Sequence, residues 1–140
     1  MSDLLYKTEF GKYYIGKCEE NLKHLKLKQK VQLILTSPPF PLNNKKRYGN
    51  LVGEDYLKWF TSLAPLFSSL LTPSGSIVIE VGNAWERNRP VQSLLHLKSL
   101  MNFVENKDAG LRLCQEFVCY NPSRLPSPAQ WVTVQRIRVT

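Results

Sequence analysis

The sequence has no long apolar run and only three cysteines, and both features restrict the classes of protein to which it can belong. No stretch approaches the roughly 18 apolar residues that a membrane-spanning helix needs. The N-terminal stretch MSDLLYKTEFGKYY lacks the basic and apolar blocks of a signal peptide. The three cysteines form no CxxC motif with a nearby histidine, so neither a disulfide framework nor a metal site is predicted. We therefore expect a cytoplasmic protein with no membrane partner.

Acidic residues are scarce relative to basic ones. The 11 Asp and Glu residues face 19 Lys and Arg, which gives a formal net charge of +8. A positive field of this size favours polyanionic partners, above all nucleic acid. The hydrophobic content of 43% suffices for a core, and the sequence shows no internal repeat and no linker. We therefore expect a single globular domain over residues 1–140.

Two apolar runs predict buried strands. Val31–Leu35 and Ile77–Val81 are short, nearly continuous and closed by proline or glycine, which favours parallel strands covered on both faces. Between them, residues 56–70 carry apolar side chains at helical spacing and predict a helix, with a kink or break at Pro65. Strand and helix thus alternate.

Further elements are predicted at both ends of the chain. A second long helix is expected to begin at Pro90, with Val91, Leu94 and Met101 in its inner stripe. Leu113–Tyr120 is expected to form a third strand. Weaker patterns predict a strand at Tyr13–Ile15, a surface helix at Glu19–Leu27 and a C-terminal strand in VTVQRIRV.

Alternating strands and helices predict an α/β fold built from βαβ units around a parallel sheet. Ligands of such sheets bind at the carboxyl ends of the strands. The tetrapeptide Ser37-Pro38-Pro39-Phe40 follows the first buried strand at that edge. Its position therefore marks it as a candidate functional site.

The tetrapeptide has groups suited to a planar aromatic amine, such as the exocyclic amino group of cytosine or adenine. The lone pair of such an amine is delocalised into the ring, so the nitrogen is a poor nucleophile. Two acceptors that bind its N–H groups, the Ser37 hydroxyl and the Pro38 carbonyl, would localise the lone pair. Pro39 stiffens the backbone, and Phe40 can stack on a base that has left the duplex.

The stretch VQLILTSPPF resembles the catalytic motif of DNA amino-methyltransferases, and its Ser and Phe form is most similar to the cytosine-N4 branch. YIGKCEENLKHL, KKRYGN, LTPSGSIVIEVGNAW and FVCYNPSRLPSPAQWVTVQRIRV extend the resemblance over nearly the whole chain, to the N-terminal portion of PvuII-type cytosine-N4 DNA methyltransferases. It implies a partial, Rossmann-like S-adenosylmethionine-dependent methyltransferase sheet with flanking helices. It also implies methylation of cytosine N4 in double-stranded DNA in a restriction-modification system, with Ser37, Pro38, Pro39 and Phe40 as catalytic residues.

The resemblance also implies where the cofactor binds. Family members of this order carry a Phe-x-Gly-x-Gly loop later in the chain, and none of the seven glycines here forms a Gly-x-Gly turn. Lys17 stands where the family usually has an Asp that helps to hold the cofactor. We therefore expect that the cofactor half is missing, and no S-adenosylmethionine-binding residue can be named in this chain. We also expect the chain alone to bind S-adenosylmethionine weakly or not at all.

Basic and polar residues near the motif are candidate DNA contacts, with solvated surface loops as the alternative interpretation. They are Lys45, Lys46, Arg47, Ser123 and Arg124. Trp85 and Trp131 are candidates for base stacking, with core or rim packing as the alternative.

Two rival functions remain open at this point. One is adenine-N6 methylation, because the motif variants of the two branches overlap. The other is an inactive DNA-binding remnant. Carbon-5 cytosine methylation is not indicated, because it needs a nucleophilic cysteine preceded by proline, and the cysteines here follow Lys17, Leu113 and Val118.

Overall fold

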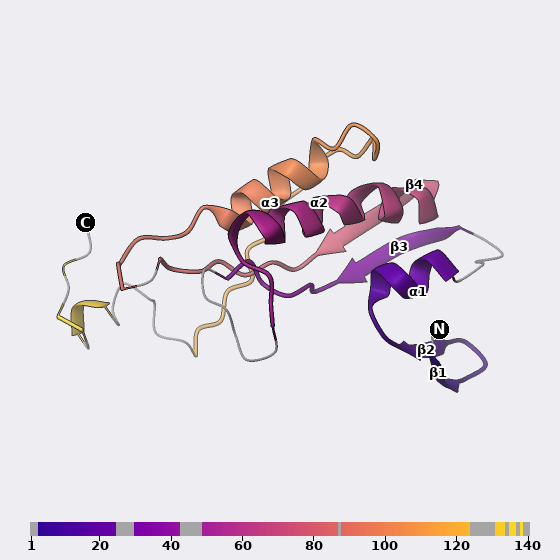
Figure 1. The fold of residues 1–140 in the computed structure, drawn as a ribbon, viewed down its shortest axis with the longest axis horizontal. Helices are drawn as coiled ribbons and strands as arrows, with labels where there is room; N and C mark the ends of the chain where they lie inside the picture. The colour runs from indigo at the N-terminus through magenta and orange to yellow at the C-terminus, as the bar shows by residue number, and fades with distance from the viewer. Residues whose placement is uncertain are drawn as a thin grey trace.

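The computed structural model describes residues 3–24, 30–42, 49–86, 88–123, 131–133, 135–136 and 138. It has the expected α/β character, with helices lying over a small parallel sheet and a separate hairpin near the N-terminus (Figure 1). The elements in chain order are β1 (Asp3–Lys7), β2 (Lys12–Ile15), α1 (Cys18–His24), β3 (Val31–Thr36), α2 (Gly53–Leu70), β4 (Leu71–Ile79) and α3 (Leu95–Val104).

Strands β3 and β4 form the parallel pair that the two apolar runs predicted, and α2 is the connection between them. In the register of this pair, Leu35 lies beside Val78, and Thr36 lies beside Ile79. The carboxyl ends of both strands therefore lie together at one edge of the sheet. Strands β1 and β2 pair antiparallel in a sheet of their own.

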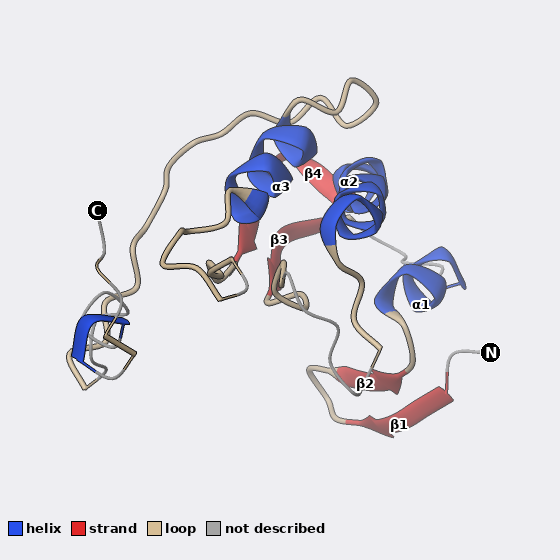
Figure 2. Ribbon diagram, turned by 60° about the vertical axis from the view of Figure 1, so that its left-hand side comes forward, coloured by secondary structure: helices blue, strands red, loops and turns tan. Residues whose placement is uncertain are grey.

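The two faces of the β3–β4 sheet differ in burial. Ile34, Ile77 and Ile79 pack against the hydrophobic core, and α2 and α3 lie on that side (Figure 2). Alternate residues point the other way, because successive side chains of a strand face opposite sides. On that outer side Leu35 is 72% exposed and Val78 is 48% exposed. The expectation that these strands are covered on both faces is therefore wrong for the described residues.

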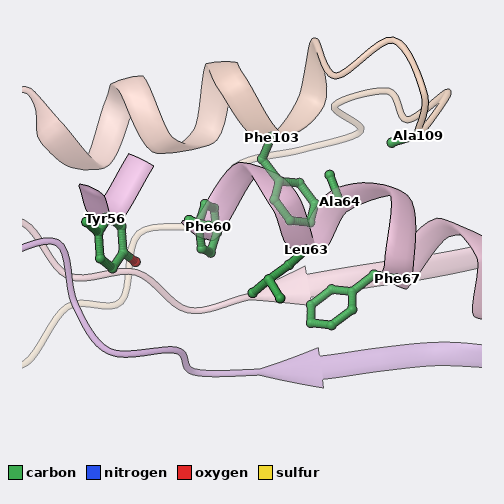
Figure 3. Packing of buried hydrophobic residues seen from close by; sticks show 7 residues of the cluster. All are labelled: Tyr56, Phe60, Leu63, Ala64, Phe67, Phe103 and Ala109. Atoms are coloured by element: carbon green, nitrogen blue, oxygen red, sulfur yellow. The ribbon is translucent and has the colours of Figure 1, made fainter. Parts of the chain in front are cut away.

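The core is an aromatic-rich cluster that α2 builds with the parts of the chain around α3 (Figure 3). Its buried members are Tyr56, Phe60, Leu63, Ala64, Phe67, Phe103 and Ala109. The α2 members recur at spacings of three and four residues, which places them on one face of the helix. The ring of Phe103 from α3 lies 5.0 Å from that of Phe60. This packing holds α2 against the face of the sheet that carries Ile34, Ile77 and Ile79.

A kink or a break was predicted at Pro65, and helix α2 continues through it to Leu70, so the break is wrong. A proline has no N–H to donate to the carbonyl four residues earlier, here that of Thr61. The side chain of Asn106 donates to that carbonyl instead, with 3.4 Å between Nδ2 and the oxygen. A partner from outside the helix thus satisfies the group that the proline leaves unpaired.

Other elements differ from their predictions. Helix α3 begins at Leu95, because Pro90 belongs to a tight loop in which the Ser93 N–H donates to the Ala84 carbonyl. Its buried face is Leu95, Ser99 and Phe103, whereas Met101 is 55% exposed.

The predicted strand Leu113–Tyr120 is wrong as well. This segment is irregular and its side chains are exposed, with Phe117 at 77% and Val118 at 89%. A strand needs a neighbour for its backbone groups, and within the described residues this segment pairs with none. Of the predicted C-terminal strand VTVQRIRV, residues 132 and 133 belong instead to a helical turn over residues 131–133 (Figure 2).

The described ranges contain no helix that combines the length and the apolar character needed to cross a membrane.

The buried hydroxyl of Tyr56 makes the free energy of unfolding fall at alkaline pH. Tyr56 is 1% exposed, and its hydroxyl has no hydrogen-bond partner among the described residues. Desolvation by burial raises the pKa of Tyr56 from 10.0 to about 12. The unfolded chain therefore loses this proton at a lower pH than the folded chain, and the stability that is present below pH 10 is lost as the pH rises toward 12.

We expect the free energy of unfolding to fall by about 2 kcal/mol more in the wild type than in Tyr56→Phe between pH 9 and pH 11.5. Urea titrations at the two pH values measure this difference. Because Tyr56→Phe removes only the hydroxyl, an equal decline in both proteins would contradict the assignment to Tyr56.

Candidate functional site

The tetrapeptide Ser37–Phe40 leaves the sheet directly after β3. The N–H of Glu80, the first residue after β4, donates to the carbonyl of Thr36 over 3.0 Å. This hydrogen bond continues the ladder by one step beyond β4 and fixes the point at which Ser37 departs. The predicted location at the carboxyl edge of a parallel pair is confirmed.

The far end of the tetrapeptide is fixed as well. Pro41 is fully buried, and the Leu42 N–H donates to the Phe40 carbonyl over 2.8 Å, which closes a tight turn. Between these ends, Ser37 and Pro39 are exposed and Pro38 is half-buried. Short restrained loops lose little entropy when they bind a ligand. The site therefore presents a hydroxyl and a stiff run of carbonyls at the surface.

The ring of Phe40 lies over Gly82, which follows β4. A Cβ atom built on Gly82 would lie 2.6 Å from Cδ2 and Cε2 of Phe40, closer than any side chain tolerates. The glycine therefore permits the ring to rest on the backbone, while Phe40 keeps 39% of its surface exposed. A hydroxyl, proline carbonyls and an anchored ring at one strand edge can bind a planar amine by hydrogen bonds and stacking.

Sequence reasoning missed the role of Gly82, which it assigned only as the end of a strand. The available signal was its place directly after the predicted strand Ile77–Val81, which neighbours the strand before the tetrapeptide. Parallel neighbours end at the same edge, so a glycine there marks a close approach of another group.

Substitution of Gly82 should displace Phe40 without unfolding the protein. In Gly82→Ala the new methyl group must move the ring, and the half-exposed ring can rotate into solvent at little cost. We expect the unfolding midpoint to stay within about 3 °C of the wild type, because Phe40 does not belong to the buried core cluster. Phe40 should become more exposed, and a chemical-shift change of the Phe40 ring in NMR spectra would report this movement. An unmoved Phe40 ring in Gly82→Ala would contradict this packing.

Of the five candidate DNA contacts, one lies within the described residues. Lys45, Lys46, Arg47 and Arg124 lie outside the described residues. Ser123 is exposed in a turn in which its N–H donates to Asn121 Oδ1 over 3.0 Å. A shared DNA-binding surface of these residues and the tetrapeptide stays a prediction.

Two tryptophans that were candidates for base stacking lie against each other. The ring centroids of Trp85, in the loop after β4, and Trp131 are 6.4 Å apart, with 56° between the ring planes. Both side chains are half-buried. This contact favours the packing interpretation and joins the 131–133 turn to the loop that follows β4.

The described residues contain no group of three or more His, Cys, Asp or Glu side chains that could hold a metal ion. Two positions bear on the cofactor site that the family resemblance implies. Lys17, where a carboxylate was expected from the family resemblance, lies 3.5 Å from Glu20 in an exposed ion pair. Gly16 precedes it with a φ of 125°, but its neighbour is the Asn21 amide rather than an open cradle.

Comparison with protein families gives a match to the model of the DNA methylase family over residues 31–136. This span covers the tetrapeptide, both parallel strands, α2 and α3.

Comparison with individual proteins gives two relatives and one solved structure. The chain is 38% identical over 134 residues to the type II methyltransferase M.PvuII of Proteus hauseri. This alignment covers 96% of this chain and 39% of that protein. It is 42% identical over 52 residues to the type II methyltransferase M.BglII of Bacillus subtilis, or 37% of this chain and 14% of that protein. The structure of PvuII DNA methyltransferase (cytosine-N4-specific) superimposes with a TM-score of 0.77 over 97% of this chain and 47% of its own, at 38% identity. This chain thus spans less than half of the M.PvuII proteins it matches.

Proposed function

The chain belongs to the DNA methylase family, and from this premise we propose that it forms the base-orienting portion of a cytosine-N4 DNA methyltransferase. The proposed reaction transfers a methyl group from S-adenosylmethionine to the exocyclic N4 of a cytosine in double-stranded DNA, as in restriction-modification systems. The observation that supports this most is the tetrapeptide Ser37–Phe40, held at both ends and exposed in the middle. Its similarity to the cytosine-N4-specific PvuII enzyme supports the choice of target atom.

Ser37 and Pro38 act on the target nitrogen in this proposal. The Ser37 hydroxyl accepts a hydrogen bond from one N–H of the cytosine amino group, and the Pro38 carbonyl accepts one from the other. Both bonds draw the nitrogen out of conjugation with the ring and localise its lone pair. S-adenosylmethionine, when bound, would supply the methyl group: the C–N bond would form as the methyl–sulfur bond breaks, S-adenosylhomocysteine would leave, and the amino nitrogen would lose one proton. Pro39 has no N–H that could compete for the Pro38 carbonyl or for the ligand.

Phe40 is proposed to receive the flipped base. A base must leave the duplex before its amino group can reach the tetrapeptide, and this unstacking costs a few kcal/mol. Stacking on an aromatic ring returns about 1 to 3 kcal/mol per base. Gly82 leaves room for the Phe40 ring to lie against the backbone, at the strand edge that the base must approach.

The DNA contacts and the cofactor site complete the proposal. Lys45, Lys46, Arg47, Ser123 and Arg124 are proposed to bind the DNA on either side of the flipped base. At the position where the family resemblance implies a carboxylate that helps to hold the cofactor, this chain has Lys17 in an exposed ion pair with Glu20. We assign S-adenosylmethionine binding to the part of the methyltransferase that this chain does not span, and we give no residue of this chain a role in holding the cofactor.

A chimera tests the function. This chain replaces the matching 134-residue segment of M.PvuII, and the product is incubated with unmethylated duplex DNA of mixed sequence and methyl-labelled S-adenosylmethionine. We expect label in the DNA, as with M.PvuII run in parallel. A chimera that folds cooperatively and binds the cofactor, but leaves the DNA unlabelled, would rule out the proposed function.

A further inference from the structure

We propose that Tyr56 is a positioning residue for methyl transfer, whose buried hydroxyl donates a hydrogen bond to a backbone carbonyl of the stretch Ser37–Pro41 once the target base is bound. This inference rests on the proposed function, because it concerns the same site. It adds to that function a residue of α2 that touches neither the base nor the cofactor. Tyr56 acts only through the backbone that orients the amino group.

The Tyr56 hydroxyl is a buried hydrogen-bond donor that lacks an acceptor. The side chain is fully buried, and its oxygen has no hydrogen-bond partner among the described residues. Buried polar groups are almost always paired, and leaving one unpaired costs more free energy than an ordinary hydrogen bond contributes. The ring packs on that of Phe60, 5.8 Å away and nearly parallel at 10°. A phenylalanine would fill the same space without that cost, so core packing does not account for the hydroxyl.

The hydroxyl lies at the edge of the sheet where the tetrapeptide begins. A helix that connects two parallel strands runs back along them, so the first turn of α2, with Tyr56, lies at the carboxyl ends of β3 and β4. Figure 1 shows α2 beginning at the end of the sheet to which the β3 and β4 arrows point. In Figure 3 the Tyr56 oxygen points away from the axis of α2, toward the chain that leaves the two strands.

The stretch Ser37–Pro41 offers many acceptors and few donors. Three of its five residues are prolines, which have a carbonyl but no N–H. The bond from the Leu42 N–H to the Phe40 carbonyl is the one hydrogen bond that the described residues donate to this stretch. Pro41 is fully buried, so part of the stretch lies below the surface, as the Tyr56 hydroxyl does. A donor without an acceptor thus lies at the same sheet edge as a stretch with spare acceptors.

Binding of the base provides the free energy to close this hydrogen bond. The structure, which contains no base, shows the Tyr56 hydroxyl unpaired among the described residues. Hydrogen bonding and stacking of the cytosine on the stretch Ser37–Phe40 can move this backbone by the small distance that a new bond needs. A bond that forms only when the base is in place stabilises the oriented arrangement and not the empty site. It therefore raises the rate of methyl transfer rather than the affinity for DNA.

Tyr56→Phe tests the proposal, because it should act differently on stability and on rate. In the isolated chain at pH 7 the variant should melt at the same temperature as the wild type or up to about 3 °C above it, because an unpaired buried hydroxyl is removed. In the chimera it should lower the kcat of methyl transfer about tenfold, the effect of one hydrogen bond. The KM for DNA should stay within about threefold, because phosphate contacts dominate DNA affinity.

Thr72→Val is the matched control. Thr72 Oγ1 is the other buried side-chain oxygen that has no partner among the described residues. Thr72 is the second residue of β4, so it lies at the end of the strand away from the tetrapeptide. This variant should match Tyr56→Phe in melting temperature within about 3 °C and should keep the kcat of the wild-type chimera. Equal losses of kcat in the two variants would overturn the proposal.

A double variant tests whether Tyr56 acts through the tetrapeptide. When Tyr56→Phe is added to the Ser37→Ala chimera, the rate should fall by less than about threefold, because the arrangement that the Tyr56 hydrogen bond supports is already lost. A further tenfold loss would mean that the hydroxyl acts independently of Ser37, and it would overturn the proposal.

The outcomes separate this inference from the proposed function. A chimera that labels DNA as fast with Tyr56→Phe as without it keeps the proposed function and removes the role of Tyr56. A Tyr56→Phe chain that melts more than about 3 °C below the wild type has the same consequence, because the hydroxyl would then already be paired in the free protein. A wild-type chimera that folds and binds the cofactor but leaves DNA unlabelled removes the proposed function and the role of Tyr56 with it.

Discussion

Replacing Ser37 with alanine in the chimera should lower the rate of methyl transfer by about 10²- to 10³-fold, the usual effect of removing one preorganised hydrogen-bond partner from a reacting group. The Ser37 hydroxyl is one of two proposed acceptors for the target amino group, and its loss leaves the Pro38 carbonyl alone. One N–H bond then stays without an acceptor, and the nitrogen keeps more of its conjugation. Single-turnover methylation at saturating DNA and cofactor measures this rate without a contribution from product release.

Two further variants separate this role from general disruption. Ser37→Asn keeps a side-chain oxygen that can accept the same hydrogen bond, so it should recover part of the lost rate. Ser62→Ala removes an exposed hydroxyl on α2, which donates to the Trp59 carbonyl of the same helix, and should leave the rate unchanged. A Ser37→Ala chimera that methylates as fast as the Ser62→Ala chimera would contradict the proposed role of the hydroxyl.

Replacing Phe60 with alanine should destabilise the isolated chain by about 3 to 5 kcal/mol, the range for loss of a buried aromatic side chain. Phe60 is 2% exposed, and its ring lies 5.8 Å from that of Tyr56 and 5.0 Å from that of Phe103. It therefore joins α2 to α3 at the centre of the core. Small domains have only about 5 to 15 kcal/mol of stability in total. We expect a urea titration of Phe60→Ala at 25 °C to show only a small part of the cooperative unfolding transition of the wild type.

Phe117→Ala is the matched control, because it deletes the same ring from a position that is 77% exposed. Its free energy of unfolding in urea should lie within about 0.5 kcal/mol of the wild type. Similar losses in the two variants would mean that the core is not centred on Phe60, in conflict with the observed packing.

The part of the fold that the sequence predicted well depends on local patterns. Val31–Leu35 and Ile77–Val81 are apolar runs of strand length, and the residues between them have helical spacing. The structure confirms both strands and the helix. The place of Ser37 at the carboxyl edge follows from these elements alone, because a parallel pair joined by a helix brings both carboxyl ends to one edge.

The features that sequence reasoning predicted wrongly depend on contacts between distant residues. Pro65 is tolerated because Asn106, 41 residues later, satisfies the freed carbonyl of Thr61. Leu113–Tyr120 has the composition of a strand, but a strand forms only beside another, and composition does not report a neighbour.

The candidate site shows the same division. The chemistry of Ser37, Pro38 and Phe40 was evident from residue types in order along the chain. The contact of Phe40 with Gly82 was not, because it joins the ends of two strands that are 42 residues apart in sequence. The chemistry that a residue can perform follows from its type and its neighbours in sequence, whereas the contacts that hold it in position depend on the fold.

The most direct test of the central claim is the identity of the modified nucleoside. The central claim is that Ser37 and Pro38 orient the amino group of a flipped cytosine for methylation. DNA treated with the chimera is digested to nucleosides and separated by liquid chromatography with mass detection, with DNA treated with the Ser37→Ala chimera alongside. The account predicts N4-methylcytosine from the first sample and a large loss of it from the second. N6-methyladenine as the product, or equal yields of N4-methylcytosine from the two samples, would contradict it.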